Sequence, residues 1–339
     1  MDSRQRIRAL IARQPADRTG FWLGNPHEET WPLYLDYFKC PDREALRRKL
    51  NDDFRWISPQ FFADAYRHPD GHKMFDDTTW ERSDSLRHPL ANVESIGELD
   101  DACHWPDAKY LNFDSCLRAL ENAGPYYRAS GFWTCFYHNV MDLMGMEKYM
   151  MDMHLNPELV HEITNRVCNF YYEANERFFA VAGDLADAFF FGNDFGTQQD
   201  LICGPEQFDE FIMGWFRKFT EQGHRWGKQV ILHSCGAIHK VVERLIDAGV
   251  DCLHPLQALA KDMDAQTLAR DFGGRITFLG GIDVQRLMVD GTPEEISQEV
   301  RRVKELLAPN LIISPSHEAL LPNVPAANVA AMAKAAVEG

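Results

Sequence analysis

The segment QVILHSCG, residues 229–236, is an apolar run that ends in a histidine and a cysteine two positions apart. A short apolar run bounded by turn residues is typical of a buried strand. Side chains alternate between the two faces of a strand, so His233 and Cys235 are expected to point to the same side at its end. Helices are predicted before and after it, at residues 204–222 and 238–248. The segment therefore predicts one unit of an alternating strand and helix chain, with two metal-ligand side chains at the strand end.

Seven further runs extend this alternation in both directions. The predicted strands begin near residues 20, 54, 127, 186, 229, 250, 276 and 310. The other predicted helices span residues 3–13, 31–38, 42–50, 156–182, 264–271, 293–307 and the chain from 325, and Gly223 is predicted to stop the helix that begins at 204. Alternation favours a parallel sheet, and eight strands favour an α/β (β/α)8 TIM barrel with an N-terminal helix. The alternative is an open doubly wound sheet, which would be expected to carry a Gly-rich phosphate loop, and no G-x-G-x-x-G or Walker sequence occurs.

A long excursion between the second and third strands is the least regular part of the predicted barrel. It spans residues 60–125 and carries many ring side chains, namely His68, His72, Trp80, His88, His104 and Trp105. We expect it to cross one mouth of the barrel. The whole chain, residues 1–339, is predicted to be a single domain, because such barrels commonly take about 250 residues as one unit.

The charge balance excludes one large class of partners. Asp and Glu outnumber Lys and Arg by 51 to 35, a formal charge of −16, and such a surface repels the phosphates of nucleic acids. No tract approaches the roughly 20 apolar residues of a membrane span, and the first helix has no apolar signal core. A cytoplasmic protein without a membrane partner is therefore expected. The eight scattered cysteines are expected to be reduced thiols.

Polar and aromatic side chains recur where the predicted strands stop. In barrels of this kind the chemistry takes place at the C-terminal ends of the strands. These ends carry Asn25, His27, Trp56, Trp133, Asn193, Asp194, Gln198, His233, Cys235, His254, Gln257, Asp283, Gln285, His317 and Glu318. The sequence therefore predicts that they surround one site.

An imidazole and a thiolate together suit zinc, which in catalytic sites usually has three protein ligands and one open position. His233 and Cys235 therefore need a third ligand from another strand. His317 is the first choice, with Asp194 and His254 as substitutes, and Asp194 is an equally good candidate for holding a ligand imidazole in place. In the alternative interpretation, His233 hydrogen-bonds a neighbouring backbone group and Cys235 is an inert buried thiol.

Other features have simpler interpretations. Phe189–Phe191 is predicted to be barrel wall, and the acidic pairs Asp52–Asp53 and Asp76–Asp77 to be solvated surface. Trp22, Trp56, Trp133 and the rings of the excursion either enclose a flat ligand or pack the barrel lip. A group of methionines is predicted to fill the core in preference to lining a pocket: Met141, Met144, Met146, Met150, Met151 and Met153.

Several of these segments resemble the uroporphyrinogen decarboxylase superfamily. They are residues 233–236 with 249–251, Gly280-Gly281-Ile282-Asp283, residues 314–317 through 322–325, residues 193–198 and residues 204–208. The resemblance covers the whole predicted barrel and implies an eight-stranded barrel fold.

The resemblance is divided on function. The decarboxylases carry an Arg-rich loop after strand one and an Asp after strand two, but here residues 24–29 contain no arginine and strand two ends at residues 57–59. Acidic side arms of a tetrapyrrole would meet acidic residues, which disfavours decarboxylation. The other branch contains zinc methyltransferases that exchange methyl groups with corrinoid proteins. Their His-x-Cys ligands match His233 and Cys235, and His317 stands near their third ligand, which is a Cys.

The resemblance to this branch implies a zinc-dependent methyltransferase that acts on a small methylated compound, such as a methoxylated aromatic or a thiol, with a corrinoid protein as partner. Family habit also implies a homodimer. Zinc is expected on His233, Cys235 and His317, catalytic roles on Asp194 and His254, and substrate contacts on Asn25, His27, Trp56, Trp133, Gln198 and Asp283. Two alternatives stay open, a lyase that uses Asp194 and His317 without metal, and a non-catalytic tetrapyrrole or corrinoid carrier.

Overall fold

The computed structural model describes residues 1–75 and 88–338. Trp80 and the Asp76–Asp77 pair, both singled out in the sequence, lie outside the described residues. No helix in this described part is long and apolar enough to cross a membrane.

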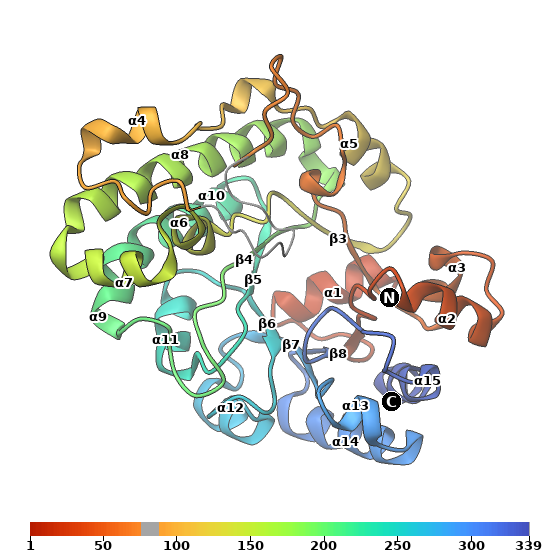
Figure 1. Cartoon of the computed structure of the whole chain (residues 1–339). Coiled ribbons are helices and arrows are strands. Elements are labelled where there is room, and N and C mark those ends of the chain that lie inside the picture. The colour runs from red at the N-terminus through yellow and green to blue at the C-terminus, as the bar shows by residue number, and fades with distance from the viewer. Residues whose placement is uncertain (76–87, 339) are drawn as a thin grey trace.

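Eight parallel strands form one sheet that curls into a nearly closed barrel (Figure 1). The strands are β1 (Gly20–Phe21), β2 (Phe54–Trp56), β3 (Tyr127–Ser130), β4 (Ala188–Gly192), β5 (Gln229–His233), β6 (Cys252–Leu256), β7 (Thr277–Ile282) and β8 (Leu311–Pro315). Their order in the sheet is β1-β8-β7-β6-β5-β4-β3-β2. This confirms the predicted (β/α)8 barrel and all eight strands, with the largest shifts in start at β4 and β6.

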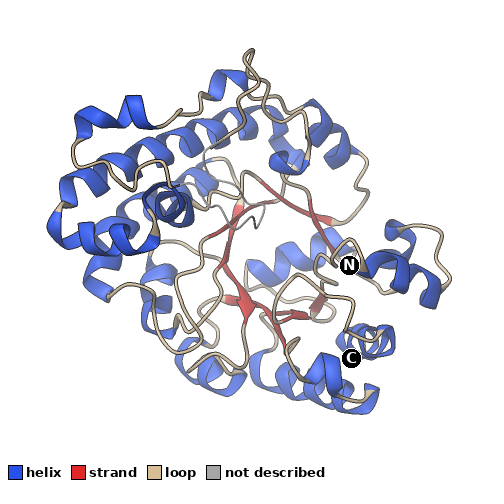
Figure 2. Ribbon diagram, in the orientation of Figure 1, coloured by secondary structure: helices blue, strands red, loops and turns tan. Residues whose placement is uncertain are grey.

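Helices surround the strands on the outside of the barrel (Figure 2). The longer ones are α1 (Ser3–Ile11), α2 (Thr30–Phe38), α3 (Arg43–Lys49), α5 (Asp114–Glu121), α6 (Phe136–Met144), α7 (Met146–Leu155), α8 (Pro157–Ala182), α10 (Met213–Arg225), α11 (His239–Asp247), α12 (Ala265–Phe272), α14 (Pro293–Leu307) and α15 (Ala326–Val337). The shorter ones are α4 (Leu99–Ala102), α9 (Pro205–Gln207) and α13 (Leu287–Asp290). The excursion is therefore more regular than predicted, because it contains α4 and α5.

Capping residues, prolines and glycines in the sequence predict some helix ends correctly and one incorrectly. Thr292 and Glu295 form a reciprocal capping box at the start of α14, with Pro293 in the first turn. Gly223, however, does not stop its helix. It lies inside α10, where a Cβ would meet Val230 Cγ2 at 2.9 Å, and the chain turns only at Gly227, which has φ +68°. Gly223 therefore allows α10 to pack closely on the sheet, and the prediction of a stop was wrong.

Most of the predicted core residues are buried. Phe190 points into the barrel, where it contacts Trp22 and Phe54, whereas Phe189 and Phe191 pack outward against helices. All three are fully buried, as expected of a barrel wall. The methionines divide: Met141, Met144 and Met153 are buried, but Met146 and Met151 are each about half exposed on α7.

The N-terminal helix α1 closes the end of the barrel opposite the C-terminal ends of the strands. Its apolar residues Ile7, Leu10 and Ile11 join a buried cluster inside the barrel that includes Phe54 and Ile312. The Leu10 carbonyl also accepts a hydrogen bond from the hydroxyl of Thr277, at the start of β7 (2.8 Å). Helix α1 therefore packs against strands that are far apart in the sequence and closes this end of the barrel.

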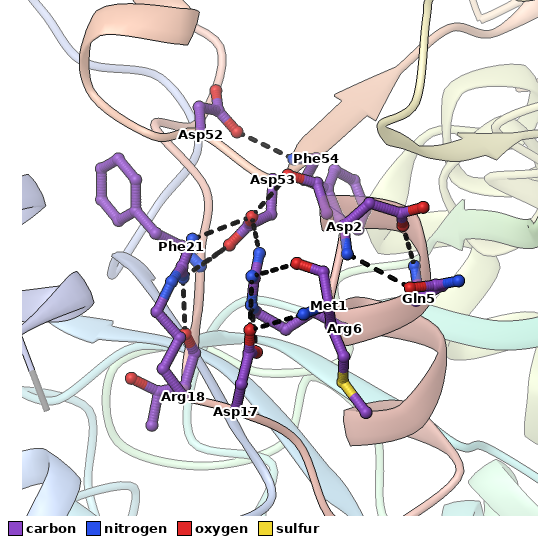
Figure 3. A network of polar contacts seen from close by, with 12 residues as sticks. Met1, Asp2, Gln5, Arg6, Asp17, Arg18, Phe21, Asp52, Asp53 and Phe54 are labelled. Carbon is purple, nitrogen blue, oxygen red and sulfur yellow. Dashed lines mark hydrogen bonds and ion pairs between the residues drawn. The ribbon is translucent and has the colours of Figure 1, made fainter.

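A buried carboxylate joins the two edges of the sheet, β1 and β2. The amide of Asp53 donates to the carbonyl of Phe21 (2.9 Å), and its Oδ2 accepts from the amide of Phe21 (3.1 Å). Arg6 and Arg18 bind the same carboxylate at 2.7 and 2.8 Å (Figure 3). The prediction that Asp52–Asp53 is solvated surface was therefore wrong. Both side chains are fully buried and paired with arginines, Asp53 with Arg6 and Arg18 and Asp52 with its sequence neighbours Arg47 and Arg55.

Candidate metal centre and its cavity

The end of β5 brings its histidine and cysteine together. His233 is the last residue of the strand, and its Nε2 lies 3.3 Å from Sγ of Cys235. His233 is buried, whereas Cys235 is partly exposed. Asp194, from the loop after β4, lies beside the pair, with its Oδ1 3.3 Å from His233 Nε2.

The neighbouring loops hold the turn that carries Cys235. The amide of Cys235 donates to Asp194 Oδ1 (2.8 Å), and the amide of Gly236 donates to Gln257 Oε1 (2.9 Å). Gly236 has φ +92°, and a Cβ there would lie 2.1 Å from the carbonyl oxygen of Gly196. Only glycine fits this turn without strain, because the backbone is left-handed and a neighbouring loop is in contact with it.

The loop after β8 supplies two more donors. The ligand atoms of His233, Cys235 and His317 all lie within 4.8 Å of one another, and so do those of His233, His254 and Glu318. Glu318 Oε2 lies 3.4 Å from His233 Nδ1 and 3.6 Å from His317 Nδ1, and this buried oxygen has no hydrogen-bond partner among the described residues. The imidazole of His233 therefore has sulfur on its Nε2 side and a carboxylate on its Nδ1 side.

His254 lies behind His233 rather than in the open site. It belongs to β6, is fully buried, and its Nδ1 is 3.0 Å from Nδ1 of His233. Trp22 and Phe190 pack against its ring. The geometry suits a residue that orients His233 more than one that meets a substrate directly.

Acidic neighbours make this a place for positive charge. Burial opposes the charged form of His233, but Glu318, Cys235 and Asp194 together raise the pKa of His233 well above its usual value. Burial likewise opposes ionisation of Asp194, yet hydrogen bonding and the charge of His233 hold the pKa of Asp194 well below its usual range. A partly buried group of imidazole, thiol and carboxylate donors fits a divalent cation of the zinc type.

Most of these donors border a cavity of about 740 Å³, but Cys235 and His254 are not among its lining residues. Asp194, His233, His317 and Glu318 line the cavity together with His138 from α6. The rest of its lining is largely aromatic or apolar: Trp56, Phe61, Met74, Phe75, Phe132, Trp133 and Tyr171. Burial lowers the pKa of His138, so its ring is neutral near pH 7.

Four of the predicted substrate contacts do not reach this cavity lining. Asn25 and His27 are exposed, and Gln198 is exposed with its amide on Gln257 (3.0 Å). Asp283 is buried, but its carboxylate accepts bonds from the amides of residues 285–287 and so shapes the turn into α13. Trp56 and Trp133 are the two predicted contacts that do line the cavity.

The sequence interpretation gave no role to two residues of this site. Glu318 was one strand-end residue among many, and only the fold shows its carboxylate beside His233. His138 lies on α6, five positions beyond Trp133, in a helix that the sequence interpretation did not identify. Recognising that a helix begins after residue 135 would have placed His138 near the mouth of the barrel.

Comparisons with known proteins identify relatives of this barrel. The sequence pattern described as Uroporphyrinogen decarboxylase (URO-D) matches residues 84–339. Among solved structures, a methyltransferase from Methanosarcina mazei superposes with a TM-score of 0.70 at 16% sequence identity, covering 99% of this chain and 98% of that chain. No curated protein matches the sequence. The structural likeness shows a shared fold, and the family pattern covers most of the chain. The chain therefore belongs to the uroporphyrinogen decarboxylase (URO-D) family.

Proposed function

We propose that this protein is a cytoplasmic, zinc-dependent methyltransferase that moves a methyl group between a small methylated substrate and a corrinoid protein. The observation that carries the proposal is the convergence of His233, Cys235 and His317 beside a largely aromatic cavity, which His233 and His317 line. The likeness to a methyltransferase supports the same reaction class. We also propose that the protein forms a homodimer, and the proposed reaction does not depend on the dimer.

In this proposal His233 Nε2, Cys235 Sγ and His317 hold zinc. When bound, zinc supplies a Lewis acid that stabilises negative charge on the substrate heteroatom. The methyl group would pass from that heteroatom to the corrinoid of the partner protein, and the heteroatom would keep the bonding electron pair and take a proton from solvent. Asp194 positions His233 and the Cys235 amide, and His254 orients the His233 ring from behind.

Metal analysis tests the first step of this proposal. The purified protein is expected to hold about one zinc per chain, because three convergent donors suffice for a catalytic site. Cys235→Ala removes the sulfur ligand of the three and is expected to lose most of the zinc. Cys40→Ala is the control and is expected to keep the zinc, because Cys40 is also partly exposed but its thiol hydrogen-bonds the Phe38 carbonyl. Zinc-free protein that is unchanged by Cys235→Ala would contradict the proposal.

Methyl transfer to free cobalamin tests the second step. With cob(I)alamin and a mixture of methoxylated aromatics and methyl thioethers, the zinc-loaded protein is expected to form methylcobalamin, followed by its absorbance. The Cys235→Ala variant is expected to form none. Corrinoid binding without turnover, and without loss in a His233→Ala variant, would point to a carrier instead.

A metal-independent carboxy-lyase is the second candidate, favoured by the description of the family pattern. Asp194 and Glu318 line the cavity and would repel the carboxylates of a porphyrinogen. Release of carbon dioxide from a porphyrinogen by zinc-free protein would favour this candidate over methyl transfer.

A further inference from the structure

An indole ring in the cavity lies directly on a glycine. Gly192 ends β4, and a Cβ there would lie 2.1 Å from Cζ2, 2.5 Å from Cη2 and 2.6 Å from Cε2 of Trp133. Three atoms of the six-membered ring therefore occupy the space that any other residue would need at position 192. The backbone of Gly192 is not left-handed, so it is the ring and not the turn that requires glycine.

The backbone of Trp133 is fixed on both sides. Its amide donates to Gln60 Oε1 (3.0 Å), and its carbonyl accepts from the amide of Gly192 (2.8 Å). The side chain is packed edge-on against His233, with ring centroids 5.1 Å apart and an angle of 62° between the planes. The indole is thus held rigidly next to the donors of the metal centre.

One part of the indole stays open to the cavity. Trp133 is partly exposed and lines the cavity, although Gly192, Trp56 and Phe190 contact it. Trp56 is tilted by 44° to it at 4.9 Å, so it supports the indole without stacking on it. A large aromatic surface that is rigid, preorganised and left partly uncovered inside a cavity is favourable for a flat ligand, because stacking adds to the burial of its area.

We propose that Trp133, seated on Gly192, is the platform on which a planar ring of the substrate stacks, so that the substrate is an aromatic methyl ether and neither an aliphatic ether nor a thiol. This inference rests on the proposed function for the identity of the transferred group. Gly192 then acts through Trp133 as a positioning residue. The stacked substrate ring would lie beside His233, so that a methoxy group on the substrate would be near the metal ligands.

Two probes of nearly the same size isolate the stacking. Guaiacol has an aromatic ring, and 2-methoxycyclohexanol carries the same substituents on a saturated ring. Calorimetric titration of the zinc-loaded protein is expected to show guaiacol binding between about twofold and tenfold more tightly, the range given by the stacking of one aromatic pair. Trp133→Leu is expected to abolish this preference, while Trp105→Leu, at a tryptophan that does not line the cavity, keeps it.

A second pair of variants keeps the test valid if Trp133→Leu does not fold. Gly192→Ala is expected to displace the indole of Trp133 and so to reduce the preference for guaiacol. The double variant Gly192→Ala, Trp133→Phe has a smaller ring at position 133 and is expected to recover part of this preference. A purely structural role for Gly192 would alter stability without changing the ratio of the two affinities. That result would overturn the inference.

The outcomes separate this inference from the proposed function. Equal affinity of the zinc-loaded wild-type protein for both probes overturns the stacking platform and leaves methyl transfer intact. A preference for guaiacol in a protein that binds no zinc supports the platform and contradicts the metal-dependent reaction.

Discussion

His224 and Asp251 form an ion pair on the outside of the barrel, near the start of β5 and therefore at the opposite end of that strand from the metal centre. His224 Nε2 lies 2.9 Å from Asp251 Oδ2, and Asp251 also accepts from the amide of Val230 (2.8 Å), at the start of β5. The hydrogen bond to Asp251 raises the pKa of His224, and partial burial opposes this only in part. The charged imidazole is therefore favoured in the folded protein.

This pair predicts a pH-dependent contribution to stability. Because the folded pKa is raised, the stabilisation is fully present below the unfolded value of about 6.5 and is lost as the pH rises through the folded value. His224→Gln is expected to lower the free energy of unfolding more at about pH 5.5 than at about pH 8.5, by less than about 1 kcal/mol because the pair is partly solvated. Urea unfolding at the two pH values measures this. Wild-type protein unfolded at the same two pH values is the reference.

Prediction at the residue scale succeeded where the local pattern was sufficient. The spacing of His233 and Cys235 on one strand predicts that they share a side, and their atoms do meet. Asn25 and His27 lie four and six positions after the end of β1, and both are exposed. Glu318 and His138 gain their positions from the packing of separate elements, which no local pattern encodes.

The turn from β5 into α11 is the element that positions the sulfur ligand. Its Gly236 has φ +92° and touches the loop after β4 at the Gly196 carbonyl. Gly236→Ala is expected to shift the Cys235 backbone and weaken zinc binding by about 10- to 100-fold, the range for loss of a supporting contact around a metal ligand. Competition with a chromophoric chelator measures the affinity.

A matched glycine separates this effect from a general one. Gly214 lies in α10 with open space around the position of a Cβ, so Gly214→Ala should leave zinc affinity unchanged and stabilise the helix by up to about 1 kcal/mol. Wild-type affinity in Gly236→Ala would show that the turn does not position the ligand.

Helices with a proline in the first turn were predicted best. Pro157 and Pro293 mark the starts of α8 and α14, and both helices were predicted with their observed ends. α6 was missed because most of its residues are buried, including Phe136, Tyr137 and Val140, so no polar face marks a helical period, and no side chain caps its start. Gly223 was misread because a glycine that allows close packing looks like a stop in sequence.

At the scale of the whole molecule, arginines of α1 bind acidic residues at the starts of separate strands. Arg6 binds Asp53 before β2, and Arg4 and Arg8 bind Asp187 before β4 at 2.8 and 3.0 Å. Both carboxylates are buried. The eight-strand alternation predicts the barrel from sequence, but these contacts span up to 183 positions and were not predictable from it.

Asp53→Asn tests whether the ion pairs of Asp53 hold the two edges of the sheet, β1 and β2, together. The change leaves Arg6 and Arg18 without their shared carboxylate, and loss of one partner from a buried ion pair costs about 3–5 kcal/mol. We expect a lower midpoint of urea unfolding, with an unchanged zinc content per folded chain because Asp53 lies at the end opposite the metal centre. Asp36→Asn, in an exposed pair with Lys39, should change stability by no more than about 1 kcal/mol. A midpoint in Asp53→Asn equal to that of the control would show that the pair does not hold the edges together.

The helix that closes the barrel also makes folding depend on contacts between residues far apart in the sequence. α1 packs against Ile312 and hydrogen-bonds through Leu10 to Thr277, 267 positions away in the sequence. Thr19, just after it, donates to the carbonyl of Ala336 near the other terminus (2.9 Å). Contacts of such large sequence separation form slowly, because the long segments between them must first be brought together, so α1 is expected to dock late in the folding of the barrel.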